Sequence, residues 1–156
     1  MPSLADPIRI IGFDPGESTG WAIVDLRRKS FEIEALGVLN EAALTQKLEG
    51  LLVDIDVIVM ENFRVRPGNA KRGSFDYSPM KTIQVIGAIK YEAKKSGIPV
   101  VLQEPAIKPM GYGFLHQPNK HLHDMDALCH LAYYCIKRKI LKSIQQLPVD
   151  QTPPAT

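Results

Sequence analysis

Runs of branched apolar residues alternate along the chain with apolar residues at helical spacing. Runs of four to eight apolar residues are typical of buried strands, and alternation of apolar with charged positions is typical of a half-exposed strand. These patterns predict strands at residues 8–14, 20–26, 31–35, 57–61 and 100–102. Apolar positions three or four apart predict helices at residues 41–52, 78–96 and 122–136, the first capped by Asn40.

The predicted order is three meander strands, a helix, a strand, a helix, a strand and a final helix. Such an order predicts an α/β domain with a five-stranded mixed sheet, the first three strands antiparallel, flanked by helices. Residues 62–77 and 105–119 show no period and are expected to be irregular. The 156 residues suit one domain (1–156), with a core at about 8–141 and a flexible tail at 148–156.

Composition adds little, since 45% hydrophobic and 23% charged residues are ordinary for a globular protein. Residues 1–7 lack the basic start and apolar centre of a secretory leader, and no apolar run approaches the length of a membrane span. We therefore expect a cytoplasmic protein without a membrane partner. Cys129 and Cys135 are six residues apart on one predicted helix, which favours buried thiols over a metal or redox pair.

Positive charge is concentrated in the irregular segment 62–77, although the whole chain has a net charge of only +2. The segment combines four basic and three aromatic residues: Arg64, Arg66, Lys71, Arg72, Phe63, Phe75 and Tyr77. Basic side chains interleaved with aromatic rings are typical of nucleic-acid contacts, whereas basic side chains alone are often only a solvated surface. The segment is therefore a candidate for binding a polyanion.

Carboxylates stand at the ends of two predicted strands and at the start of the last helix. Asp14 and Glu61 close buried strands, and His123 and Asp126 share one face of the helix because they are three residues apart. Buried carboxylates need counter-charges, and oxygen-rich ligands favour Mg²⁺ or Mn²⁺. We expect two such ions per site, with Asp124 as an alternative to His123 for the fourth ligand.

A zinc site built from His121, His123 and His130 is the competing interpretation. Residues two apart point in different directions on a helix, and no cysteine lies suitably close in the sequence. The carboxylate pattern is therefore the stronger prediction.

The chain resembles a RuvC-like Holliday-junction resolvase of the RNase H-like (retroviral-integrase) superfamily, of a phage or related type. The resemblance covers residues 8–140 and rests on three motifs in order: Asp14-Pro15-Gly16, Glu61, and His123 with Asp126-Ala127-Leu128. A weaker likeness joins Pro105-Ala106-Ile107-Lys108 and Lys120 to the family's phosphate-binding lysines. The best-known bacterial members have Asp in place of His123.

The resemblance implies a homodimeric nuclease that makes paired symmetric nicks in four-way DNA junctions. It implies that Asp14, Glu61, His123 and Asp126 are catalytic, that Lys108 and Lys120 bind DNA, and that a loop aromatic opens the junction centre. The same cluster also suits other branched DNA or RNA–DNA hybrids. The run Asp-Pro-Gly-Glu-Ser-Thr-Gly from Asp14 also resembles the phosphate loop of actin-like nucleotide-binding proteins, but those proteins close two such domains over the nucleotide.

Overall fold

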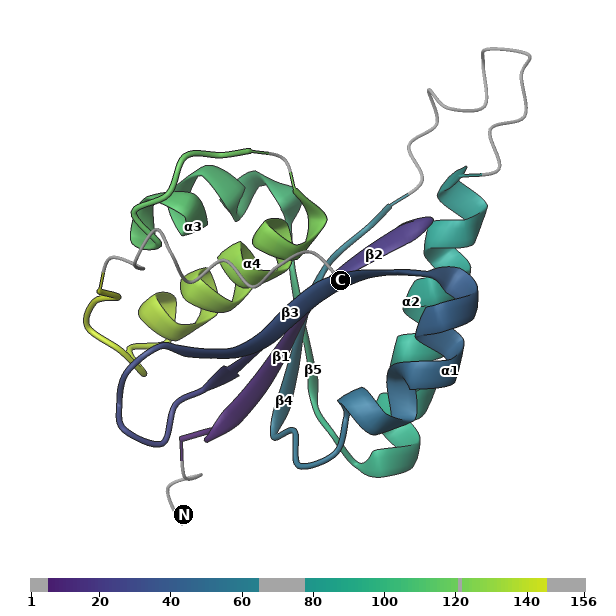
Figure 1. Cartoon of the computed structure of the whole chain (residues 1–156), viewed down its shortest axis with the longest axis horizontal. Coiled ribbons are helices and arrows are strands. Elements are labelled where there is room, and N and C mark those ends of the chain that lie inside the picture. The colour runs from purple at the N-terminus through teal and green to yellow at the C-terminus, as the bar shows by residue number, and fades with distance from the viewer. Residues whose placement is uncertain (1–5, 65–77, 121, 146–156) are drawn as a thin grey trace.

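The structure, a computed structural model, describes residues 6–64, 78–120 and 122–145. These residues form a five-stranded sheet of strand order β3-β2-β1-β4-β5 with helices on both faces (Figure 1). The strands are β1 Arg9–Asp14, β2 Ser18–Asp25, β3 Glu32–Asn40, β4 Val57–Glu61 and β5 Val100–Gln103. The helical elements are α1 Glu41–Leu51, α2 Ser78–Ser96, the 3-10 turn η2 Pro105–Ile107, α3 Lys108–Phe114 and α4 His123–Lys137.

The predicted mixed sheet is confirmed. Strands β1, β2 and β3 pair antiparallel, and β1, β4 and β5 pair parallel. Helices α3 and α4 cover one face of the sheet, and α1 and α2 cover the other (Figure 1). In the described part of the chain, no helix is long and apolar enough to cross a membrane.

Several element boundaries differ from the sequence-based expectation, and one helical segment was not expected. Strand β1 begins at Arg9, and Ile8 before it is about half exposed. Strand β3 continues to Asn40, whose side chain also accepts a hydrogen bond from the Ala43 amide to cap α1. The expected irregularity of residues 105–119 is wrong, since η2 and α3 occupy most of this segment. Gly111 lies in α3 and packs directly against Cys129.

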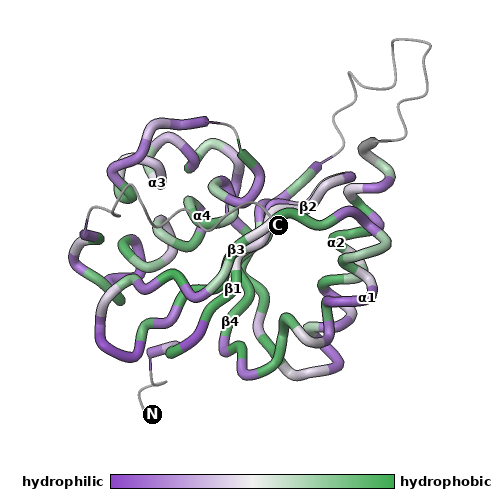
Figure 2. Tube along the Cα trace, in the orientation of Figure 1, coloured by the Kyte–Doolittle hydropathy of each residue, from purple (hydrophilic) through white to green (hydrophobic). Residues whose placement is uncertain are grey.

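The alternation of side chains along the strands builds a separate core on each face. Ile11 and Phe13 of β1 pack toward α1 and α2, whereas Ile10 packs beneath α4. Figure 2 shows hydrophobic colour along much of β1 and β4, in keeping with strands that are covered on both sides. The same alternation puts the last residue of β1, Asp14, on the α4 face.

Helix α4 approaches the sheet most closely where β1 and β2 lack side chains. A Cβ atom on Gly12 would lie 2.6 Å from the carbonyl oxygen of Ala127, and one on Gly20 would overlap the carbonyl of His123. Gly20 is also the register partner of Asp14 in the β1–β2 pair. The two glycines therefore bring the first turn of α4 over the end of β1.

We expect Gly20→Ala to destabilise the protein by about 3 kcal/mol, the upper end for adding a methyl group to a packed core, because the obstructing atoms are backbone. Gly87→Ala on α2 is the matched control, since a Cβ there meets nothing within 4 Å. It should be neutral or stabilise by up to about 1 kcal/mol through helix propensity. Urea unfolding measures both, and equal midpoints for Gly20→Ala and the wild type would contradict this packing of α4.

Candidate metal and nuclease site

The structure brings four of the predicted residues together at one edge of the sheet. Asp14 and Glu61 end neighbouring parallel strands, and the register that pairs Phe13 with Met60 sets the two acidic residues side by side. His123 and Asp126 reach the same place from the first turn of α4. Asp14 and Asp126 are buried, and the Glu61 side chain is 14% exposed.

Two cationic or hydrogen-bonding groups connect the members of this cluster. His123 Nδ1 lies 3.0 Å from Asp14 Oδ2. Lys108 Nζ, from the start of α3, lies 3.1 Å from Glu61 Oε2 and 3.5 Å from Asp126 Oδ2. Lys108, expected from the sequence to bind DNA, is therefore an internal counter-ion of the carboxylates in this structure.

Burial and mutual repulsion act differently on the two strand-end carboxylates. Burial raises the pKa of Asp14, the hydrogen bond from His123 lowers it, and the charges of Glu61 and Asp126 add to the rise. For Glu61, burial also raises the pKa, but His130 and Lys108 together outweigh it and hold the pKa below its usual value. The positive charges and hydrogen bonds around Glu61 therefore compensate for its burial, whereas those around Asp14 do not.

The structure adds three functional candidates that the sequence analysis did not assign to the site. Tyr112 donates a hydrogen bond of 2.5 Å to Asp126 Oδ1. The pKa of the Tyr112 hydroxyl is raised, mainly by burial and also by the negative charge of Asp126. His130 Nε2 lies 3.0 Å from Glu61 Oε2, and Gln103 contacts the other ring nitrogen. One signal was available in the sequence, since His130 follows Asp126 by four residues and so shares its helix face.

The donor set fits a hard divalent cation. Three carboxylates and an imidazole suit Mg²⁺ or Mn²⁺, and the Lys108 ammonium between Glu61 and Asp126 shows that the cluster accommodates positive charge. Within residues 6–64, 78–120 and 122–145, no three acidic, histidine or cysteine side chains already converge as a set of metal ligands. A bound cation would take over the neutralising role of Lys108.

The remaining predicted residues fall outside this cluster. Asp124 accepts a hydrogen bond from the Met125 amide, and Arg64 is exposed and paired with Glu104 at 3.4 Å. Phe63 is half-buried and Lys120 is exposed. Several predicted positions lie outside the described residues: Arg66, Lys71, Arg72, Phe75, Tyr77, His121 and the tail 148–156.

Two further predictions concern the histidines and cysteines of α4. His123 and His130 contact different carboxylates, Asp14 and Glu61, so the structure does not join them in the zinc site considered from the sequence. Cys129 and Cys135 are buried free thiols, as predicted, and burial raises the pKa of Cys135 to about 12.

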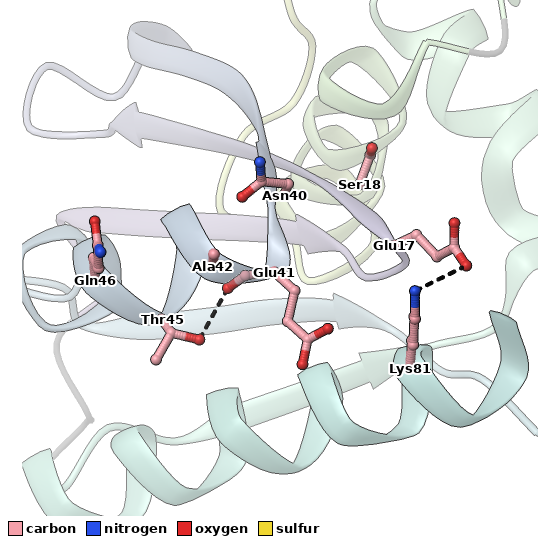
Figure 3. Close-up of a pocket in the computed structure, with 8 residues that line it drawn as sticks. All are labelled: Glu17, Ser18, Asn40, Glu41, Ala42, Thr45, Gln46 and Lys81. Carbon is pink, nitrogen blue, oxygen red and sulfur yellow. Dashed lines mark hydrogen bonds and ion pairs between the residues drawn. The ribbon is translucent and has the colours of Figure 1, made fainter. Parts of the chain in front are cut away.

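An open surface depression of about 670 Å³ lies beside the turn that follows β1. Glu17 and Lys81 of α2 form an ion pair of 3.7 Å on one side of it, and residues 40–46, at the start of α1, line the other side (Figure 3). None of the four clustered residues lines this depression. The candidate catalytic residues therefore lie in the cluster under α4, outside this depression.

Solved structures share this arrangement of strands and helices, although no protein-family profile and no curated protein sequence matches the chain. Thermus thermophilus RuvC in complex with a Holliday junction substrate superposes with a TM-score of 0.63 and 17% identity, covering 85% of this chain and 96% of RuvC. The chain has the RuvC-like, RNase H-like fold. The fowlpox virus Holliday junction resolvase gives a TM-score of 0.53 at 15% identity, covering 84% of this chain and 99% of the viral one.

In the metal-free protein, we expect Asp14→Asn to raise the melting temperature at neutral pH. The folded-state pKa of Asp14 is raised, so its ionisation costs stability as pH rises from its unfolded pKa, about 3.9, through the folded value. The gain should shrink toward pH 4, where the wild-type carboxyl is increasingly protonated. Each 1 kcal/mol corresponds to about 2–4 °C for a chain of this size.

Asp25→Asn provides the control of opposite sign. Hydrogen bonds from the Arg27 amide and guanidinium lower the pKa of Asp25, so that carboxylate stabilises the fold at neutral pH and loses this effect as pH falls. Thermal unfolding with a chelator present compares both variants with the wild type. A lower melting temperature for Asp14→Asn at pH 7 would contradict the electrostatic account of the cluster.

Proposed function

We propose that this protein is a structure-selective endonuclease that cuts four-way (Holliday) DNA junctions by metal-dependent phosphodiester hydrolysis. The observation that carries the proposal is that Asp14, Glu61, His123 and Asp126 lie side by side at the edge where β1, β4 and α4 meet. The RuvC-like fold supports it, because one protein of that fold is described with a Holliday junction substrate.

In this proposal the four clustered residues would hold two Mg²⁺ or Mn²⁺ ions. When bound, such ions supply a water nucleophile of lowered pKa and stabilise charge on the departing 3′ oxygen. The hydrogen bonds from His123 to Asp14 and from Tyr112 to Asp126 orient the ligand oxygens. If a cation displaced it from the carboxylates, the Lys108 ammonium would be available to neutralise a phosphate oxygen of the substrate.

DNA contact is assigned to the basic segment after β4 and to the lysines near α3. The proposed phosphate-binding residues are Arg64, Arg66, Lys71, Arg72, Lys108 and Lys120, and the proposed junction-opening residues are Phe63, Phe75 and Tyr77. A homodimer with two-fold symmetry would place two sites on the two strands of a two-fold junction, giving paired symmetric nicks. A phage-type origin and a cytoplasmic location remain predictions.

Asp14→Asn should abolish cleavage of a synthetic four-way junction, because the variant loses an anionic ligand of the proposed metal ions. Junction binding should persist, because phosphate contacts elsewhere supply most of the affinity. Single-turnover cleavage and gel-shift titrations measure the two effects. Glu49→Gln on the exposed side of α1 serves as the control, with wild-type values expected for both.

The substrate is tested by mapping the nicks. Symmetric nicks on both strands of the junction support the proposal, whereas faster cleavage of a replication fork or an RNA–DNA hybrid would reassign the same cluster to that substrate. Normal turnover by Asp14→Asn would refute the assignment of the cluster as the nuclease site.

His123→Asp should change the metal preference of the reaction. An imidazole ligand favours Mn²⁺ over Mg²⁺ more than a carboxylate does, so the ratio of the Mn²⁺-supported to the Mg²⁺-supported rate should be larger in the wild type. Asp124→Asn is the comparison variant, since the Asp124 side chain bonds to the Met125 amide in the structure. An unchanged ratio in His123→Asp together with a changed ratio in Asp124→Asn would move the ligand to Asp124.

A further inference from the structure

His130 is completely buried in α4, beneath the acidic cluster, and both of its ring nitrogens have partners. Nε2 lies 3.0 Å from Glu61 Oε2, and Nδ1 lies 3.1 Å from Gln103 Nε2. The same Gln103 nitrogen donates to the backbone carbonyl of His130 at 2.9 Å. A polar ring in a core is costly unless it is satisfied, and here the satisfying groups lead directly to the candidate site.

The contacts define which nitrogen of His130 carries the proton. A backbone carbonyl only accepts, so the Gln103 atom beside it is the amide NH₂ group. The second hydrogen of that group is directed to Nδ1, which therefore accepts. The proton of the neutral imidazole is then on Nε2, from which it is donated to the Glu61 carboxylate.

The three residues come from three different elements. Glu61 ends β4, and its register partner Gln103 ends β5. The Asn62 amide donates to the Gln103 carbonyl at 2.7 Å and extends this pairing by one residue. His130 crosses from α4 and so fixes the carboxylate relative to the helix that also carries His123 and Asp126.

We propose that His130, oriented by Gln103, is a positioning residue that holds the Glu61 carboxylate ready to bind a divalent cation. This inference rests on the proposed function, in which Glu61 is a metal ligand. Hydrogen bonds to a ligating carboxylate restrict its rotation and lower the cost of ordering it on binding. Lys108 contacts the same oxygen, Oε2, but through a partly exposed ammonium that a cation would replace, whereas the buried His130 ring has a partner at each nitrogen.

The test measures Mn²⁺ binding directly, by the loss of the free-ion EPR signal on titration with the protein. His130→Leu removes both ring nitrogens and should raise the Mn²⁺ dissociation constant about 10–100-fold. His130→Gln retains an NH₂ donor and should lie closer to the wild type. Gln103→Leu leaves the ring in place and should raise the constant by a smaller factor in the same direction.

Cys135→Ala is the matched control for a purely structural effect. Cys135 is fully buried in the same helix and is a free thiol, so its truncation should lower the melting temperature without changing the Mn²⁺ constant. Circular dichroism verifies that each variant is folded. If His130→Leu does not fold, Gln103→Leu, at a half-buried strand end, provides the test.

Two outcomes separate this inference from the proposed function. Wild-type Mn²⁺ constants in folded His130→Leu and Gln103→Leu would overturn the positioning role, even if the wild type cuts junctions. Weakened Mn²⁺ binding in these variants, with no cleavage of any junction by the wild type, would overturn the proposed function and support the positioning role. A wild type that binds no Mn²⁺ would overturn both.

Discussion

The contact between the first turns of α4 and the middle of the sheet governs the candidate site. It is possible because β1 and β2 present glycine where the helix crosses, at Gly12 and Gly20. The hydrogen bond from His123 to Asp14 joins residues 109 positions apart and exists only at this helix-to-sheet distance. Side chains in a close-packed interior transmit small displacements, so a change in this contact would move every ligand that α4 contributes.

The cluster is an arrangement of like charges that the protein stabilises with its own groups. Lys108 neutralises Glu61 and Asp126, Tyr112 donates to Asp126, and His130 donates to Glu61. Among the described residues Asp14 has a hydrogen bond from His123, but burial, with the charges of Glu61 and Asp126, still raises its pKa. Such residual repulsion lowers the stability of the folded protein, as is common at functional sites.

The five strands and the acidic residues of the site could be predicted from local sequence pattern. Strand ends follow from apolar runs, so Asp14 and Glu61 were found as the last residues of β1 and β4. Helix α3 was missed because Gly111 and Gly113 weaken intrinsic helix propensity, and tertiary packing against Cys129 overrides that preference. With α3 missed, the positions of Lys108 and Tyr112 in the cluster could not be inferred.

The sequence alone determined the order of the five strands and of the three longer helices, the alternation that turns Asp14 and Glu61 toward one face, and the helical spacing that pairs His123 with Asp126. Only the tertiary structure decided which partner each carboxylate receives: Lys108 between two of them, Tyr112 on one, and His130 with Gln103 on another. The physical reason is distance. A hydrogen bond requires its atoms to be within about 3 Å, and that separation is set by how helices pack on the sheet, which no local periodicity encodes.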